Sequence, residues 1–206
     1  MPQSDPRLSN ALLDLAAIRG QMARTGEFRG YGPLALAATA VVALGAAALQ
    51  PRVVALPLRT PNLYAQWWSA VALLAAALIA AEAVVRARRL HAGLADAMLR
   101  SAAAQFLPAA VAGLLLTPVL LRARPEAAAL LPGLWQILFS LGVFATCRML
   151  PRALLLVAVW YLATGLLTLA SADAGLAPWM MGVPFAAGQS LAAVLLWKDK
   201  HEPRQV

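Results

Sequence analysis

The stretch of residues 67–89 constrains the fold of this chain more than any other. It begins with two tryptophans, continues with apolar residues and ends in a segment that holds three arginines. The apolar part has about the 20 residues that a helix needs to cross a hydrocarbon core. Tryptophan rings favour the headgroup level, and arginine is retained on the cytoplasmic side. The stretch therefore predicts a transmembrane helix with Trp67 outside and Arg86 inside.

The composition extends this prediction to the whole chain. Hydrophobic residues make up 62% and charged residues 13% of the sequence, against roughly 45–50% and about 25% in soluble domains. A water-soluble fold could not bury so much apolar surface. The net charge of +8 would suggest nucleic acid as a partner of a soluble chain, but here the basic residues flank apolar runs. We therefore expect the lipid bilayer, and no nucleic acid, as a partner.

Six apolar runs predict an all-α membrane protein, a six-transmembrane-helix bundle over residues 31–197. Before it, residues 1–30 place Leu8 and Leu12 at helical spacing and then turn through glycines. This pattern predicts a cytoplasmic amphipathic N-terminal helix and an elbow, and residues 198–206 are expected to form a cytoplasmic tail. The six spans are expected at about 33–49, 66–85, 103–121, 127–147, 153–171 and 176–197.

The basic residues predict the orientation of the bundle. An even number of spans places both termini on one side of the membrane. If that side is the cytoplasm, thirteen of the 17 basic residues lie inside and four outside. Short cytoplasmic segments carry an excess of Lys and Arg, so we predict N-in and C-in. The arginines of residues 86–89 can also bind anionic lipid headgroups there.

Two motifs carry a resemblance to a known group of proteins. They are Ile18-x-x-x-Met22-x-Arg24-Thr25-x-x-Phe28 leading to Gly30 and Gly32, and Leu131-Pro-Gly-Leu-Trp135 through Cys147-Arg148-Met-Leu-Pro151. With them the chain resembles a family of uncharacterised bacterial six-span integral membrane proteins. The resemblance covers most of the chain and implies a multi-pass protein of the bacterial inner (plasma) membrane. It implies no activity.

Glu82 is the acidic residue that lies inside an expected span. A charged group at mid-bilayer costs about 2.5–3.5 kcal/mol on insertion scales, which makes Glu82 a candidate for proton or cation coupling. Alternatively, Glu82 pairs with Arg86, four residues later near the cytoplasmic end of the same helix. A third alternative is an ion pair with Arg19, which falls in the apolar stripe of the amphipathic helix. Glu82, Arg86 and Arg19 are therefore the candidate structural or coupling residues.

Polar and aromatic residues of the last three spans are candidates to line a cavity at mid-depth. A substrate pathway through the bundle would need such groups, whereas hydrogen bonding between helices is their commoner use in membranes. The candidate cavity-lining residues are Gln136, Trp160, Tyr161, Thr164 and Gln189.

No motif of an enzyme is present in the sequence. A Ser–His–Asp arrangement, a His-Glu-x-x-His motif, a glycine-rich phosphate loop and an acidic metal cluster are all missing. The expected spans also contain no histidine and no aspartate that could act as a base. We expect no enzymatic activity, no catalytic residues and no cofactor or metal.

Two functions remain. The first is a scaffold, accessory or regulatory membrane subunit, whose amphipathic N-terminal helix docks on the membrane surface or on a membrane or cytoplasmic protein partner. The second is a small secondary transporter built from a 3+3 inverted repeat, because three spans per half give the required inversion. Prolines that could break helices near a midplane site are Pro108, Pro118, Pro132 and Pro184.

Overall fold

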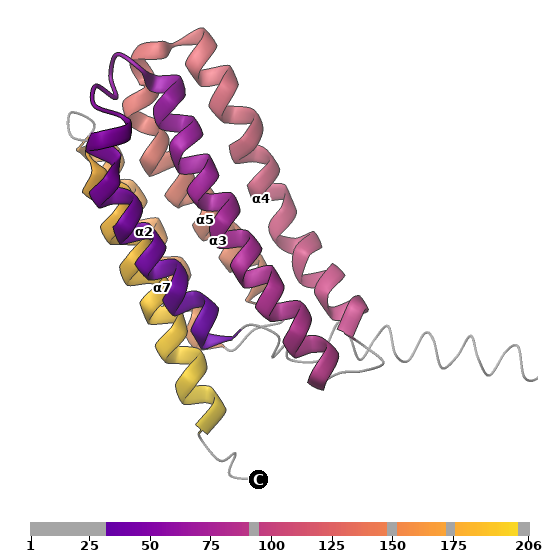
Figure 1. Cartoon of the computed structure of the whole chain (residues 1–206). Coiled ribbons are helices and arrows are strands. Elements are labelled where there is room, and N and C mark those ends of the chain that lie inside the picture. The colour runs from indigo at the N-terminus through magenta and orange to yellow at the C-terminus, as the bar shows by residue number, and fades with distance from the viewer. Residues whose placement is uncertain (1–31, 91–94, 148–151, 172–175, 202–206) are drawn as a thin grey trace, which may run out of the picture.

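The computed structural model describes residues 32–90, 95–147, 152–171 and 176–201 (Figure 1). These residues form six long α-helices and two short 3-10 helices, and they contain no strand. The all-α six-helix prediction is therefore confirmed, whereas the amphipathic helix expected within residues 1–30 lies outside the described residues. The elements are α2 (Pro33–Val53), α3 (Pro61–Leu90), α4 (Ala95–Ala123), η1 (Pro125–Leu130), α5 (Leu131–Thr146), η2 (Arg152–Leu154), α6 (Leu155–Ala170) and α7 (Pro178–His201).

All six α-helices take part in segments that are long and apolar enough to cross a membrane. The chain is thus a polytopic membrane protein. The segments are Pro33–Val53, Pro61–Val85, Ala103–Ala123, Pro125–Thr146, Arg152–Ala170 and Pro178–Asp199.

The helix ends differ from the expected ones mainly around prolines. Helix α2 was expected to end before Pro51, but it continues through this proline to Val53. A proline removes one backbone hydrogen bond, and a helix embedded among other helices tolerates that loss. Helix α3 begins earlier than the expected span because Pro61 occupies its first position, where no N–H donor is needed.

The six helices form a closed ring in chain order, since each packs on its two sequence neighbours and α7 returns to α2. Figure 1 shows the long helices running alongside one another, with the α2–α3 and α4–α5 connections at one end. We call this end of the bundle the α2–α3 end. The first turn of α2 and the last turn of α7 lie at the opposite end.

Glycines allow the closest helix approach in the ring. A Cβ added to Gly133 of α5 would lie 2.8 Å from the backbone oxygen of Gly165 in α6, and one added to Gly165 would lie 3.0 Å from the oxygen of Gly133. Between α2 and α7, Gly182 packs against Ala47 in the same way. Lipid provides no hydrophobic force between helices, so such close packing holds the bundle together.

An aromatic cluster joins four helices of the bundle. The ring of Phe139 in α5 lies 5.3 Å from Phe106 of α4, 4.7 Å from Tyr161 of α6 and 5.4 Å from Phe185 of α7, measured between centroids. Four helices therefore meet around one side chain. On the outside, apolar side chains such as Leu73 (72% exposed) and Leu114 (71% exposed) face the surroundings, as lipid contact requires.

Candidate functional site

Three groups of polar contacts and one pocket are the candidate sites in the described residues. The first group surrounds Pro184 in α7. Proline has no N–H, so the carbonyl of Met180, one turn earlier, lacks its helical partner. Gln136 of α5 replaces that partner, because its Nε2 donates a hydrogen bond of 2.9 Å to the Met180 oxygen. The same Nε2 lies 3.4 Å from Thr168 Oγ1 of α6, so one amide joins three helices.

Trp160 and Tyr161 of α6 bind two carbonyls of α7 that lie one turn beyond Met180. Trp160 Nε1 donates a hydrogen bond of 2.9 Å to the oxygen of Pro184. The Tyr161 hydroxyl lies 3.4 Å from the oxygen of Phe185 and also pairs with the side chain of Gln189. Together with Gln136, these side chains surround the proline-containing part of α7.

Thr164 has a different environment from the other candidate cavity-lining residues. It is half-buried, and its hydroxyl donates to the Trp160 oxygen of its own helix at 3.0 Å. Gln136 and Tyr161 are fully buried and Gln189 is 7% exposed. The structure thus brings four of the five residues together around α7, and Thr164 remains bonded within α6.

Two atoms of α5 are buried without a hydrogen-bond partner among the described residues: Gln136 Oε1 and Ser140 Oγ. Both residues are completely buried, and a spacing of four places them on one face of the helix. An unpaired buried acceptor costs about 1–3 kcal/mol, which a bound water would recover. Ser140 was not among the predicted site residues, although it follows Gln136 by four residues in the sequence.

The second group joins α3 to the first turn of α2. Glu82 Oε2 accepts a hydrogen bond of 2.6 Å from the backbone N–H of Ala35. The N-cap residue Gly32 supplies no side-chain cap, and the first turn holds no acidic residue. Because a helix N-terminus has unpaired N–H groups and a partial positive charge, a carboxylate there is favourable. Glu82 therefore caps α2 from the neighbouring helix.

Gly32 is the residue that makes room for this cap. A Cβ at Gly32 would overlap the carboxyl group of Glu82. Arg19 and the side chain of Arg86 lie outside the described part of the chain, so the ion pairs of Glu82 with them stay predictions. Sequence spacing indicated neither Gly32 nor Ala35 as a contact, since both are about 50 residues from Glu82.

The third group lies at the α2–α3 end, around Gln50. Its Nε2 donates to the oxygen of Leu176 at 3.0 Å, and its Oε1 accepts from Trp68 Nε1 at 2.9 Å. This completely buried amide connects α2, α3 and the start of α7. By sequence, Gln50 was interpreted only as part of a helix breaker. Its uncharged polar side chain at the end of an apolar run could have indicated a hydrogen bond between helices.

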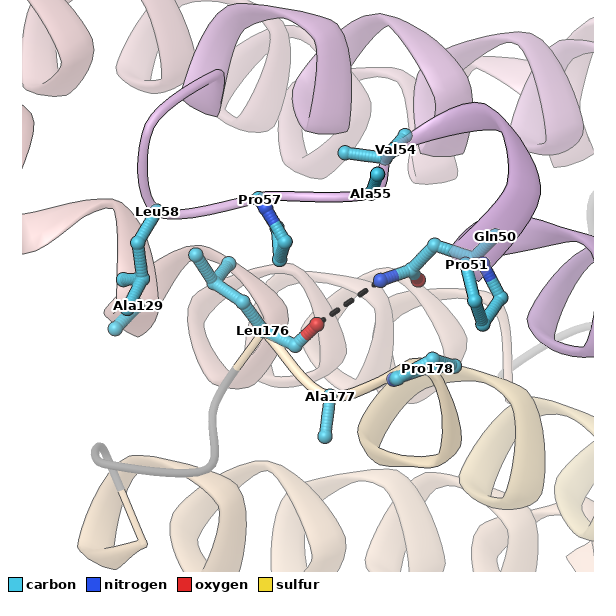
Figure 2. Close-up of a pocket in the computed structure, with 10 residues that line it drawn as sticks. All are labelled: Gln50, Pro51, Val54, Ala55, Pro57, Leu58, Ala129, Leu176, Ala177 and Pro178. Atoms are coloured by element: carbon cyan, nitrogen blue, oxygen red, sulfur yellow. Dashed lines mark hydrogen bonds between the residues drawn. The ribbon is translucent and has the colours of Figure 1, made fainter.

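The pocket lies beside Gln50 at the same end (Figure 2). It has a volume of about 260 Å³ and opens between the α2–α3 connection and the start of α7. Proline, alanine and leucine side chains form most of its wall. Within the described residues, no three His, Cys, Asp or Glu side chains gather as a metal site would require.

Comparison of the chain with protein-family models, with curated proteins and with solved structures gave no match in any of the three.

Proposed function

We propose that this chain is a non-enzymatic scaffold, accessory or regulatory subunit of the bacterial inner membrane, with both termini in the cytoplasm. The carrying observation is the hydrogen bonding around Pro184. Side chains of α5 and α6 donate hydrogen bonds to three carbonyls of α7, those of Met180, Pro184 and Phe185. Side chains engaged in this way hold helices together, which is what a protein with a structural role needs.

Two further features support this proposal over transport. The aromatic rings around Phe139 pack on one another and join four helices. None of the four polar residues around α7 is among the residues that line the pocket at the α2–α3 end. A protein that holds partners in the membrane needs a stable bundle and no pathway through it.

The competing proposal is a small secondary transporter with a 3+3 inverted repeat. The sequential ring supports it, because a shift by three helices maps every neighbouring pair onto another neighbouring pair. The unpaired Gln136 Oε1 and Ser140 Oγ also support it, since a transported polar molecule would need free groups at mid-depth. In the described residues, however, α4 and α7 run through Pro108, Pro118 and Pro184 as continuous helices, so no broken helix supports this proposal.

Extraction of the full-length chain with its surrounding lipid from native membranes distinguishes the two proposals. We expect one membrane protein to copurify in a fixed ratio, and a Gln136→Leu, Ser140→Ala variant that remains folded to retain it. The control is Gly45→Ala, since a Cβ at Gly45 meets no atom within 4 Å.

Vesicles that contain only the purified chain provide the second part of this experiment. A subunit without transport activity leaves ion and solute gradients across the vesicle unchanged. Gradient-driven uptake that is lost in the Gln136→Leu, Ser140→Ala variant, together with the absence of any copurifying protein, would refute the accessory role and favour transport.

A further inference from the structure

The pocket at the α2–α3 end has walls that suit hydrocarbon. Pro57 of the α2–α3 connection and Pro178 at the start of α7 lie on opposite sides of it (Figure 2). Gln50 is its main polar side chain, and both ends of that amide are already hydrogen-bonded within the protein. A polar ligand would find few groups to bind in this wall, whereas an acyl chain or glycerol backbone needs only contact.

Two arginines are next in sequence to residues that line the pocket. Arg52 directly follows the lining residue Pro51, Arg59 directly follows the lining residue Leu58, and both arginines are exposed. By sequence, residues 50–66 hold these two arginines and no acidic residue. Such an excess of positive charge attracts an anionic headgroup.

Exposed leucines in the same connection indicate that it contacts lipid. Leu56 is 56% exposed and Leu58 is 72% exposed, although neither lies within a helix. Large apolar side chains of a loop are unfavourable in water and favourable among acyl chains. With Arg59 next to Leu58, the α2–α3 connection matches the headgroup boundary of a bilayer, where apolar and charged groups lie side by side.

From these three observations we propose that the pocket binds one anionic phospholipid of the leaflet at the α2–α3 end. Its glycerol and upper acyl region packs on the proline and alanine wall, and its phosphate binds Arg52 and Arg59. The proposal is independent of the accessory role, since a transporter could carry the same lipid site. It differs from headgroup binding by residues 86–89, which lie at the other end of α3.

Native mass spectrometry of the full-length chain, reconstituted with defined mixtures of phosphatidylglycerol and phosphatidylcholine, tests the proposal. We expect one retained phosphatidylglycerol in the parent chain. Each basic residue near an anionic surface contributes about 1 kcal/mol, so the double variant Arg52→Gln, Arg59→Gln is expected to weaken retention about 30-fold. The matched control Arg122→Gln, Arg124→Gln removes the same charge at the same end and is expected to change retention less than about 3-fold.

A third variant tests the wall of the pocket. Pro57→Trp enlarges a side chain that points into the pocket (Figure 2) and keeps every charge, so it is expected to lower phosphatidylglycerol retention while the parent melting temperature is preserved. Three results would overturn the proposal: unchanged retention in the Arg52→Gln, Arg59→Gln variant, an equal loss in the Arg122→Gln, Arg124→Gln control, or unchanged retention in Pro57→Trp. Displacement of the lipid by millimolar inorganic phosphate would show a free-phosphate site and would also overturn it.

Discussion

Replacing Glu82 by alanine is expected to loosen the first turn of α2. The carboxylate of Glu82 accepts the Ala35 N–H at 2.6 Å, and the N-cap Gly32 has no side chain to replace it. Loss of an N-cap acceptor costs about 1 kcal/mol, within a range of roughly 0.5–2. Loss of the charge at the positive end of the helix costs about 0.3–1 kcal/mol. These two effects overlap, so we expect Glu82→Ala to lower the free energy of unfolding by about 1–2 kcal/mol.

Glu82→Gln separates the two contributions. The glutamine side chain keeps an oxygen that can accept the Ala35 N–H, but it removes the negative charge. We therefore expect Glu82→Gln to cost only the charge contribution, about 0.3–1 kcal/mol. Glu126→Gln is a suitable control, because Glu126 pairs with Arg124 at 3.5 Å on the exposed surface and such pairs contribute little.

Gly32→Ala gives the sharpest test of this geometry. A methyl group at Gly32 would overlap the Glu82 carboxyl and displace it from Ala35. In the parent chain this substitution is expected to cost about as much as Glu82→Ala, because the same cap is lost. In the Glu82→Ala background the overlap no longer exists, so the cost of Gly32→Ala should fall to the intrinsic preference of an N-cap for glycine over alanine, roughly 0.5–1 kcal/mol.

The assay is reversible unfolding of the four chains in mixed detergent micelles, followed by far-ultraviolet circular dichroism. The double-mutant cycle should give a coupling energy of about 1 kcal/mol between Gly32 and Glu82, well above the few tenths that independent sites show. Strictly additive effects of the two substitutions would refute the capping geometry. A large loss in the control Gly45→Ala would instead show that glycine replacement in α2 is harmful in general, although a Cβ there meets no atom.

Three further predictions concern the packing and the orientation of the bundle. Gln136→Leu is expected to lower the free energy of unfolding of the parent chain by about 0.6 kcal/mol and at most about 1.7. In a Pro184→Ala background the loss should be smaller, because the new N–H of residue 184 can bind the Met180 carbonyl. Equal losses in both backgrounds, measured in the same unfolding assay, would contradict this. Gly133→Ala is expected to cost about 1–3 kcal/mol by overpacking α5 against α6, and unfolding no easier than in the parent chain would show that this contact can relax. In a chain without its native cysteine, a Thr60→Cys variant is expected to react with an impermeant maleimide added to intact spheroplasts, because Thr60 is exposed in the α2–α3 connection; labelling only after lysis would contradict the proposed orientation.

The sequence by itself determined the six helices. In lipid, each backbone N–H and C=O must be paired within the chain, so an apolar run of about 20 residues has little choice but a helix. Residues 67–89 show this directly, because their apolar core lies within α3 as expected. The same reasoning explains why prolines such as Pro51 gave wrong helix ends: a neighbouring helix can supply what the proline removes, and the sequence does not show which helix is near.

Only the tertiary structure decided which partner each polar residue has. The fold brings the carboxyl of Glu82 to the N–H of Ala35, 47 residues away, a contact that no spacing in the sequence indicated, and the pairs with Arg86 and Arg19 stay predictions. Gln136 was recognised as a polar residue within a span, but its acceptor is a carbonyl that Pro184 frees on α7. Hydrophobicity does not select neighbours among helices that are all surrounded by lipid. Close packing at glycines and a few polar contacts make that selection, and they arise only when the helices are assembled.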